Sequence, residues 1–178
     1  DTQSAVVSTS SSKDGLKLAV GTAAGSIGVL DVMTHGYTTP LRSHRGSVIA
    51  VAVDPSDKRD EFATVSEDCT VRVWDLITGA QRYQFSSPED PPTCVAYPPC
   101  SLRQHDGGRH LVGGYSSGVM RVFDVPSTST LVEYQQHRGA IQQQVVFVPD
   151  GTCVISAGAD GLLCLYNVSR GYQPARVM

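Results

Sequence analysis

The sequence has no long apolar segment and no surplus of basic residues. None of its apolar runs approaches the roughly 18 residues that a bilayer-spanning helix needs, and its first residues lack the basic-then-apolar order of a secretion signal. With Lys+Arg 14 against Asp+Glu 17 and a net charge of −3, it also lacks the basic stripe of a nucleic-acid binder. We therefore expect no membrane span and no nucleic-acid partner.

The sequence also lacks a regular cysteine pattern and an initiator methionine. Its cysteines are 5 in number and unevenly spaced, which argues against a disulfide framework and favours reduced thiols in the cytoplasm. The missing methionine indicates that the chain is part of a longer protein.

What the sequence does contain is one unit repeated four times. The units end in related pairs at intervals of 44, 49 and 43 residues: Leu30-Asp31, Trp74-Asp75, Phe123-Asp124 and Tyr166-Asn167. A period in the low forties that ends on Trp-Asp is typical of four-stranded propeller blades. We predict blades at residues 1–43, 44–87, 88–136 and 137–178.

Within each unit, short runs with period-two alternation are separated by Gly, Pro and Asp turns, as expected for strands buried on one face. The second unit is the most regular, with strands predicted at Val48–Val53, Glu61–Ser66, Thr70–Asp75 and Gln81–Phe85. The third carries an inserted loop at residues 98–109. The fourth has 12 residues from His137 to Pro149 where the second has 11 from His44 to Pro55, and the extra residue predicts a β-bulge.

A histidine and an aspartate recur at similar spacing in the second and fourth units. Flanked by strands, they are expected to be buried, and a buried polar group is costly unless it is paired. We therefore interpret His44 and Asp68 as structural residues rather than catalytic ones.

These residues resemble the WD40 repeat family, in which His, Ser/Thr, Asp and Trp form a buried hydrogen-bonded tetrad. The matching residues are His44, Thr64, Asp68 and Trp74 in the second unit, and His137, Ser156, Asp160 and Tyr166 in the fourth. The first and third units lack the Asp and the Trp, so we expect apolar packing alone to hold them. The resemblance implies an all-β fold: a WD40 β-propeller sector of four blades, each a four-stranded antiparallel sheet, within a propeller of seven or eight blades.

A narrower resemblance is to the centriolar WD repeat-containing protein 90 family. It is carried by residues 88–97, 135–140, 156–158 and 163–166. That family implies a large microtubule-associated protein of the centriole, basal body or cilium.

Two patterns with possible chemistry are weighed against the repeat. Gly114-Tyr115-Ser116-Ser117-Gly118 matches a nucleophile elbow, but that motif requires a following helix and here a strand pattern follows. Cys94, Cys100, His105 and His110 could suggest zinc, yet the cysteine spacing exceeds that of structural zinc pairs. We predict no catalytic residue, no metal and no cofactor.

The WD40 resemblance also implies partner-contact positions beside the tetrad residues. They are Ser47, Ile49 and Glu67 in the second unit, Ala140, Gln142 and Ala159 in the fourth, and Thr93 and Ser116 in the third. Tyr115 and the inserted loop stand out from the pattern as further candidates, since loops on rigid scaffolds often carry function.

Together these features predict a non-catalytic protein–protein interaction scaffold. The expected partners are the remaining blades of the same propeller and other proteins, among them tubulin, microtubule inner proteins or centriolar scaffold proteins. The alternative is a substrate-recruiting adaptor subunit of a ubiquitin ligase or chromatin complex. Such adaptors usually have an aromatic- or Arg-lined pocket, which the sequence does not indicate.

Overall fold

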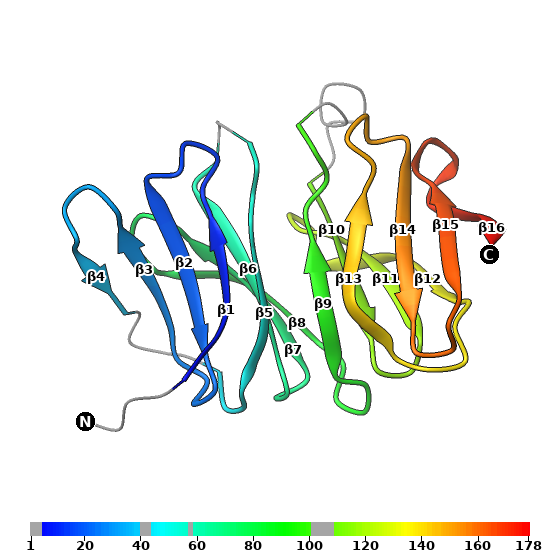
Figure 1. The fold of residues 1–178 in the computed structure, drawn as a ribbon, viewed down its shortest axis with the longest axis horizontal. Coiled ribbons are helices and arrows are strands. Elements are labelled where there is room, and N and C mark those ends of the chain that lie inside the picture. The colour runs from blue at the N-terminus through cyan, green and yellow to red at the C-terminus, as the bar shows by residue number, and fades with distance from the viewer. Residues whose placement is uncertain (1–4, 40–43, 57–58, 101–108) are drawn as a thin grey trace. The chain divides into compact units, whose positions relative to one another are not determined.

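The computed structural model describes the chain except for residues 1–4, 40–43, 57–58 and 101–108, and it leaves out the side chains of Gln142 and Gln143. The chain forms two compact units, Asp1–Pro91 and Pro92–Met178. Each unit contains two four-stranded antiparallel sheets, as Figure 1 shows. Within the described residues, no helix combines the length and hydropathy that crossing a membrane requires.

Unit 1 begins with a sheet in the order β1-β2-β3-β4 and continues with β5-β6-β7-β8. The strands of the first sheet are β1 (Val6–Ser11), β2 (Lys17–Thr22), β3 (Ile27–Asp31) and β4 (Tyr37–Thr38). Those of the second are β5 (Val48–Val53), β6 (Glu61–Ser66), β7 (Thr70–Asp75) and β8 (Gln81–Ser86). Figure 1 shows β1 beside β5, and two serines of β1 accept hydrogen bonds from the β5 backbone N–H groups of Val51 and Val53 at 3.1 Å.

Unit 2 repeats this arrangement. Its first sheet contains β9 (Pro92–Ala96), β10 (His110–Tyr115), β11 (Val119–Asp124) and β12 (Ser129–Gln135). Its second contains β13 (Ile141–Phe147), β14 (Cys153–Gly158), β15 (Leu163–Asn167) and β16 (Gln173–Val177). A short 3-10 turn, η1 (Val168–Arg170), precedes β16 and was not predicted.

The core of each unit lies between its two sheets. In unit 1, Ile27 and Val29 pack in one cluster with Phe62 and Trp74. In unit 2, the corresponding cluster includes Met120, Val122, Val154 and Tyr166, all buried. The side chains that fill these clusters come from alternate positions of central strands, because successive residues of a strand point to opposite faces.

The first strand of the fourth repeat contains the predicted bulge. In β5, Val48 and Ala50 pair with the adjacent residues Ser66 and Val65, so one residue is extra. In β13, Ile141 and Val145 pair with Gly158 and Ser156, which leaves two extra residues. The additional residue inferred from the spacing in the sequence is therefore confirmed as a β-bulge.

The fold class is confirmed: the described chain is all-β, with four four-stranded antiparallel sheets. Three strands of the second repeat have the predicted bounds. In the first repeat, the last strand, β4, covers only Tyr37–Thr38, and residues 40–43 lie outside the described part. Most of the inserted loop at 98–109 also lies outside it.

Candidate functional site

The polar residues singled out in the second repeat come together as a hydrogen-bonded chain. His44 precedes β5, Thr64 lies on β6, Asp68 in the β6–β7 turn and Trp74 on β7. His44 Nε2 lies 2.7 Å from Thr64 Oγ1, and His44 Nδ1 lies 3.0 Å from Asp68 Oδ2. Trp74 Nε1 donates to the same Thr64 hydroxyl at 2.8 Å. The hydroxyl of Thr64 thus joins the histidine to the tryptophan, and we name these four residues the first tetrad.

The fourth repeat contains a second tetrad with the same geometry. His137 Nε2 lies 2.8 Å from Ser156 Oγ, and His137 Nδ1 lies 3.0 Å from Asp160 Oδ1. The contact between Ser156 Oγ and Tyr166 Oη is longer, at 3.4 Å. A phenol in place of the indole therefore completes this tetrad with a weaker hydrogen bond.

Each tetrad aspartate also fixes two loops. Asp68 Oδ2 accepts from the backbone N–H of Arg45 at 3.0 Å, and Asp160 Oδ2 accepts from that of Arg138 at 2.9 Å. The other carboxylate oxygen accepts from a backbone N–H two residues further along the turn. The loops at residues 44–47 and 137–140, which we name the leading loops, are thereby tied to the β6–β7 and β14–β15 turns.

The charge state of the tetrads follows from burial and hydrogen bonding. Burial opposes ionisation of Asp68, but hydrogen bonds from Thr70, Arg45 and His44 outweigh it and lower its pKa to about 2. Burial lowers the pKa of His44, against the opposing charge of Asp68. The Arg138 backbone hydrogen bond is the main cause that lowers the pKa of Asp160 to about 2. Near neutral pH the first tetrad thus pairs a neutral imidazole with an ionised carboxylate.

The tetrad histidines have their ring nitrogens engaged by partners within the protein. His44 and His137 are 5% and 2% exposed, and both ring nitrogens of each already contact a tetrad partner. A general base must reach the proton that it abstracts from a substrate. The ring nitrogens of these two histidines instead contact tetrad side chains, which does not favour a role as general base.

Two residues that the sequence interpretation missed extend the first tetrad. The Thr70 hydroxyl donates to Asp68 Oδ1 at 2.6 Å, and the Arg72 guanidinium donates to Asp68 Oδ2 at 3.3 Å. Both lie on β7 at alternate positions with Trp74, so they share its face. Their period-two spacing from Trp74 is the sequence signal that could have identified them.

An ion-pair cluster on the second sheet of unit 1 was also missed. Glu61 and Asp75 are cross-strand partners, and Arg82 on β8 forms a salt bridge with each of them. Glu61 is only 1% exposed, so the salt bridge with Arg82 helps to stabilise its buried carboxylate. Two acids that face each other across a hairpin were the sequence signal for a nearby cation.

The third repeat does not rely on apolar packing alone, so that expectation was wrong. The guanidinium of Arg121 lies 4.1 Å from the ring centroid of Tyr115, and its Nε donates to Glu133 at 2.8 Å. Gly113 occupies the position of Thr64 in the second repeat, and the Tyr115 ring lies 3.3 Å from where its Cβ would be. Tyr115 thus fills the space left by a missing tetrad.

Tyr115 is therefore placed differently from the expectation that singled it out as a partner contact. It is 1% exposed, so its ring is not at the surface. The turn that follows it joins β10 directly to β11, with Gly118 at φ +86° and its N–H bonded to the Tyr115 carbonyl. The resemblance of this stretch to a nucleophile elbow ends there, since a strand and not a helix follows.

The remaining predicted contact positions are divided between the two units. In unit 1, Glu67 is exposed, Ser47 and Ile49 are half-buried, and the Glu67 N–H donates to the Ser47 carbonyl at 3.0 Å. In unit 2, Ser116 and Ala159 are exposed. Ala140 and Thr93 are half-buried, and the Thr93 hydroxyl donates to the Ile141 carbonyl at 2.6 Å. The side chain of Gln142 lies outside the described residues.

The residues considered for zinc do not converge in the described part of the chain. Cys94 is buried with its Sγ facing Gly114, and burial raises the pKa of its thiol. His110 instead lies 3.0 Å from the Tyr172 hydroxyl, and His105 falls outside the described residues. No group of three or more His, Cys, Asp or Glu that could hold a metal is found among the described residues.

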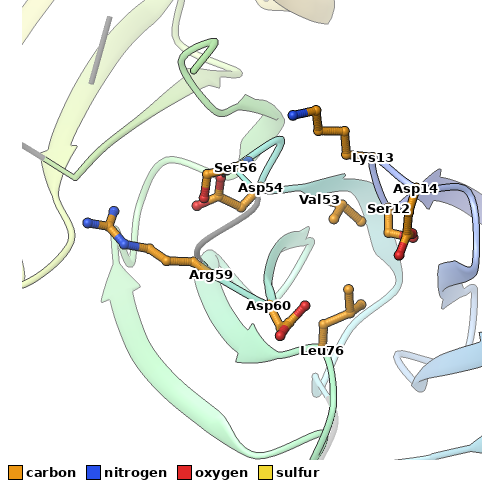
Figure 2. Close-up of a pocket in the computed structure, with 9 residues that line it drawn as sticks. All are labelled: Ser12, Lys13, Asp14, Val53, Asp54, Ser56, Arg59, Asp60 and Leu76. Carbon is orange, nitrogen blue, oxygen red and sulfur yellow. Dashed lines mark hydrogen bonds between the residues drawn. The ribbon is translucent and has the colours of Figure 1, made fainter. Parts of the chain in front are cut away.

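A polar pocket of about 250 Å³, drawn in Figure 2, lies in unit 1. Asp14, Asp54 and Asp60 line it together with Lys13 and Arg59. In Figure 2 the Lys13 and Arg59 side chains come from different sides of the pocket, and that of Arg59 points away from its centre. The carboxylates of Asp14 and Asp54 already accept hydrogen bonds from nearby backbone N–H groups. Because these charges do not converge on one position, we assign the pocket no ligand.

Four-stranded sheets with two buried His–Ser/Thr–Asp tetrads define a segment of a WD40 β-propeller. The computationally designed Ika4 protein has the same fold, with a TM-score of 0.75 and 22% identity over 94% of this chain and 93% of that one. A sequence profile of the family described as WDR90, 4th beta-propeller, matches residues 51–178. The chain belongs to this WDR90 fourth β-propeller family.

Individual relatives agree with this assignment. The chain is 41% identical over 162 residues to WD repeat-containing protein 90 of Mus musculus, which covers 91% of this chain. It is 46% identical over 176 residues to Centriole proteome protein 16 of Chlamydomonas reinhardtii, which covers 99% of it. The chain spans 8% of the length of each of these relatives.

Proposed function

We propose that the chain acts as a non-catalytic protein–protein interaction scaffold within a large microtubule-associated protein of the centriole, basal body or cilium. Its family membership and a relative named for the centriole proteome support this proposal. The observation that carries it is the division of roles in the structure. The histidines and hydroxyl residues that could take part in chemistry are engaged in buried tetrads, whereas Glu67, Ser116 and Ala159 are exposed in turns.

In this proposal the tetrads hold the blades, and the leading loops and turn tips meet partners. The contacts would involve Ser47, Ile49 and Glu67 on unit 1, and Ser116 and Ala159 on unit 2. Tyr115 is left out because it is buried. Partner proteins would include tubulin or centriolar scaffold proteins.

The remaining blades of the same propeller form a second class of proposed partner. Apolar side chains are exposed on the first and last sheets, for instance Val7 at 48%, Tyr37 at 53%, Leu163 at 44% and Val177 at 47%. A repeat sheet of this kind is stabilised by stacking on its neighbours. We propose that further blades cover these residues in the parent protein.

Proximity labelling from the full-length parent in ciliated cells tests the scaffold proposal. A biotin ligase fused beside the chain should label centriolar and microtubule-associated proteins in preference to other proteins. Enrichment of ubiquitin-ligase or chromatin subunits instead would favour the adaptor alternative. A parent that carries a neutral linker in place of the 178 residues is the control, and unchanged labelling by it would refute a scaffold role for this segment.

A further inference from the structure

The two leading loops share the sequence His-Arg-Gly, and each presents an exposed arginine. Arg45 follows His44 in unit 1, and Arg138 follows His137 in unit 2. In both loops the histidine is buried in a tetrad while the next side chain lies at the surface. The tetrads therefore set the position of these two arginines.

The backbone beneath Arg138 is held from three directions. Its N–H donates to Asp160 Oδ2 at 2.9 Å, and the preceding His137 ring is fixed within the tetrad. The Gly118 turn packs against the same loop so closely that a Cβ there would lie 2.5 Å from the His137 carbonyl oxygen. A side chain on such a fixed backbone loses less conformational freedom when it binds, which favours affinity.

The side chain of Arg138 is exposed at the surface of its leading loop. Arg138 forms no salt bridge with any residue that the structure describes. The carboxylate beneath it, Asp160, is occupied by the Arg138 N–H, the His137 ring and the Leu162 N–H. The neighbouring turn tip is Ala159, which is exposed and uncharged. Asp160 is itself ionised, but Ala159 adds no second negative charge at this turn tip, so an approaching anion meets less repulsion here than beside an acidic residue.

Arg45 differs in one respect. Glu67 occupies the position of Ala159, is exposed, and has its Cβ 3.2 Å from where a Cβ of Gly46 would lie. A carboxylate beside Arg45 repels a second carboxylate and lowers the local attraction for it. The chain thus contains the same loop in two electrostatic settings.

From this contrast we propose that Arg138, with Ala159 beside it, binds a carboxylate of an acidic segment in a partner protein. The proposal rests on the scaffold function and names the chemistry of one partner contact. Arginine suits it because its planar guanidinium pairs with a carboxylate through two parallel hydrogen bonds. Arginines are also over-represented among the residues that dominate interfaces.

The test uses fluorescence anisotropy with the 178-residue chain and a labelled peptide of ten residues rich in glutamate. Binding should weaken with added salt and should be absent for a peptide with glutamine in place of glutamate. Arg138→Gln should raise the Kd by about fivefold or more, a loss typical of a single charged contact. Ala159→Glu, which copies the setting of Arg45, should do the same.

Arg45→Gln is the matched control and should leave the Kd within about twofold of the wild type. The double variant Glu67→Ala/Arg138→Gln should recover part of the binding through Arg45. Equal Kd values for the wild type and Arg138→Gln, or equal binding of both peptides, would overturn the proposal. Thermal melting of every variant separates loss of binding from loss of folding.

Failure of this inference is distinguishable from failure of the scaffold function. If Arg138→Gln binds the acidic peptide normally while the parent still labels centriolar proteins, the scaffold function stands and the arginine contact is refuted. If labelling is lost only when the whole segment is replaced, partner binding uses other surfaces.

Discussion

Replacing Thr64 by valine removes the central hydroxyl of the first tetrad while it keeps the shape of the side chain. Thr64 is 0% exposed, and its hydroxyl contacts both Trp74 Nε1, at 2.8 Å, and His44 Nε2, at 2.7 Å. The substitution leaves two buried polar groups without this partner, each at a cost of about 1–3 kcal/mol. Because the two losses share one site and do not simply add, we expect a destabilisation of about 2–4 kcal/mol. Small domains have only about 5–15 kcal/mol of stability, so the loss would be large.

Urea unfolding followed by tryptophan fluorescence measures this effect, since Trp74 is the single tryptophan of the chain and lies in the tetrad. Thr64→Ser keeps the hydroxyl and should cost only about 1 kcal/mol for its lost methyl group. Ser156→Ala in the second tetrad should cost less than Thr64→Val, because its contact with Tyr166 is longer. An unsatisfied buried polar group costs roughly 1–3 kcal/mol. If the free energy of unfolding of Thr64→Val lay within about 0.5 kcal/mol of the wild-type value, the stabilising role of the hydroxyl would therefore be refuted.

Four further outcomes are expected. Stability should fall as pH drops below about 6.5, because the unfolded chain protonates His44 at its ordinary pKa while burial lowers that pKa in the fold. A further loss of stability on the order of 1 kcal/mol should follow between about pH 4 and 2 as Asp68 is protonated, because the fold lowers its pKa from 3.8 to about 2. A urea midpoint that stayed flat from pH 7 to 3 would contradict both pH effects. Arg82→Met should destabilise by about 2 kcal/mol through the buried Glu61, measured by urea unfolding, and no change would show that the ion pair is dispensable. Gly118→Ala should cost about 2 kcal/mol or more, since it places a Cβ against a carbonyl at positive φ, and an unchanged melting temperature would refute that packing.

The repeat pattern predicted the fold because each blade signals itself locally. Period-two alternation, Gly turns and terminal pairs of a large apolar or aromatic residue with Asp or Asn recur at intervals of 43 to 49 residues, and these features require no knowledge of distant contacts. The strands of the second repeat accordingly matched the prediction at β5, β6 and β7. The bulge in β13 was also predictable, because an extra residue between two fixed points must leave the ladder.

The side-chain partnerships outside the tetrads were harder to predict. Arg121 stacks on Tyr115 only because Gly113 leaves room for the ring, and this depends on packing in three dimensions. A tyrosine beside a turn suggested exposure, whereas the space of a missing tetrad favoured its burial. Likewise, Arg82 pairs with Glu61 across two strand pairings, and sequence separation hides that contact.

The arginines of the leading loops were visible in the sequence but carried no signal by themselves. Their significance depends on which neighbouring residues are acidic and on which polar atoms are already engaged. The backbone N–H groups of Arg45 and Arg138 are bound in the same way, and what distinguishes Arg138 is that Ala159, not an acidic residue, lies at the neighbouring turn tip.

The proposed function of this chain is that of an interaction scaffold at the centriole, basal body or cilium. Its most direct test is fluorescence microscopy of the tagged full-length parent in ciliated cells, compared with the parent in which a neutral linker replaces these 178 residues. We predict centriolar signal for the intact parent and a marked loss of that signal, or of its centriolar partners, for the replacement. A nuclear distribution of the intact parent, or equal centriolar signal and partners for both forms, would contradict the claim.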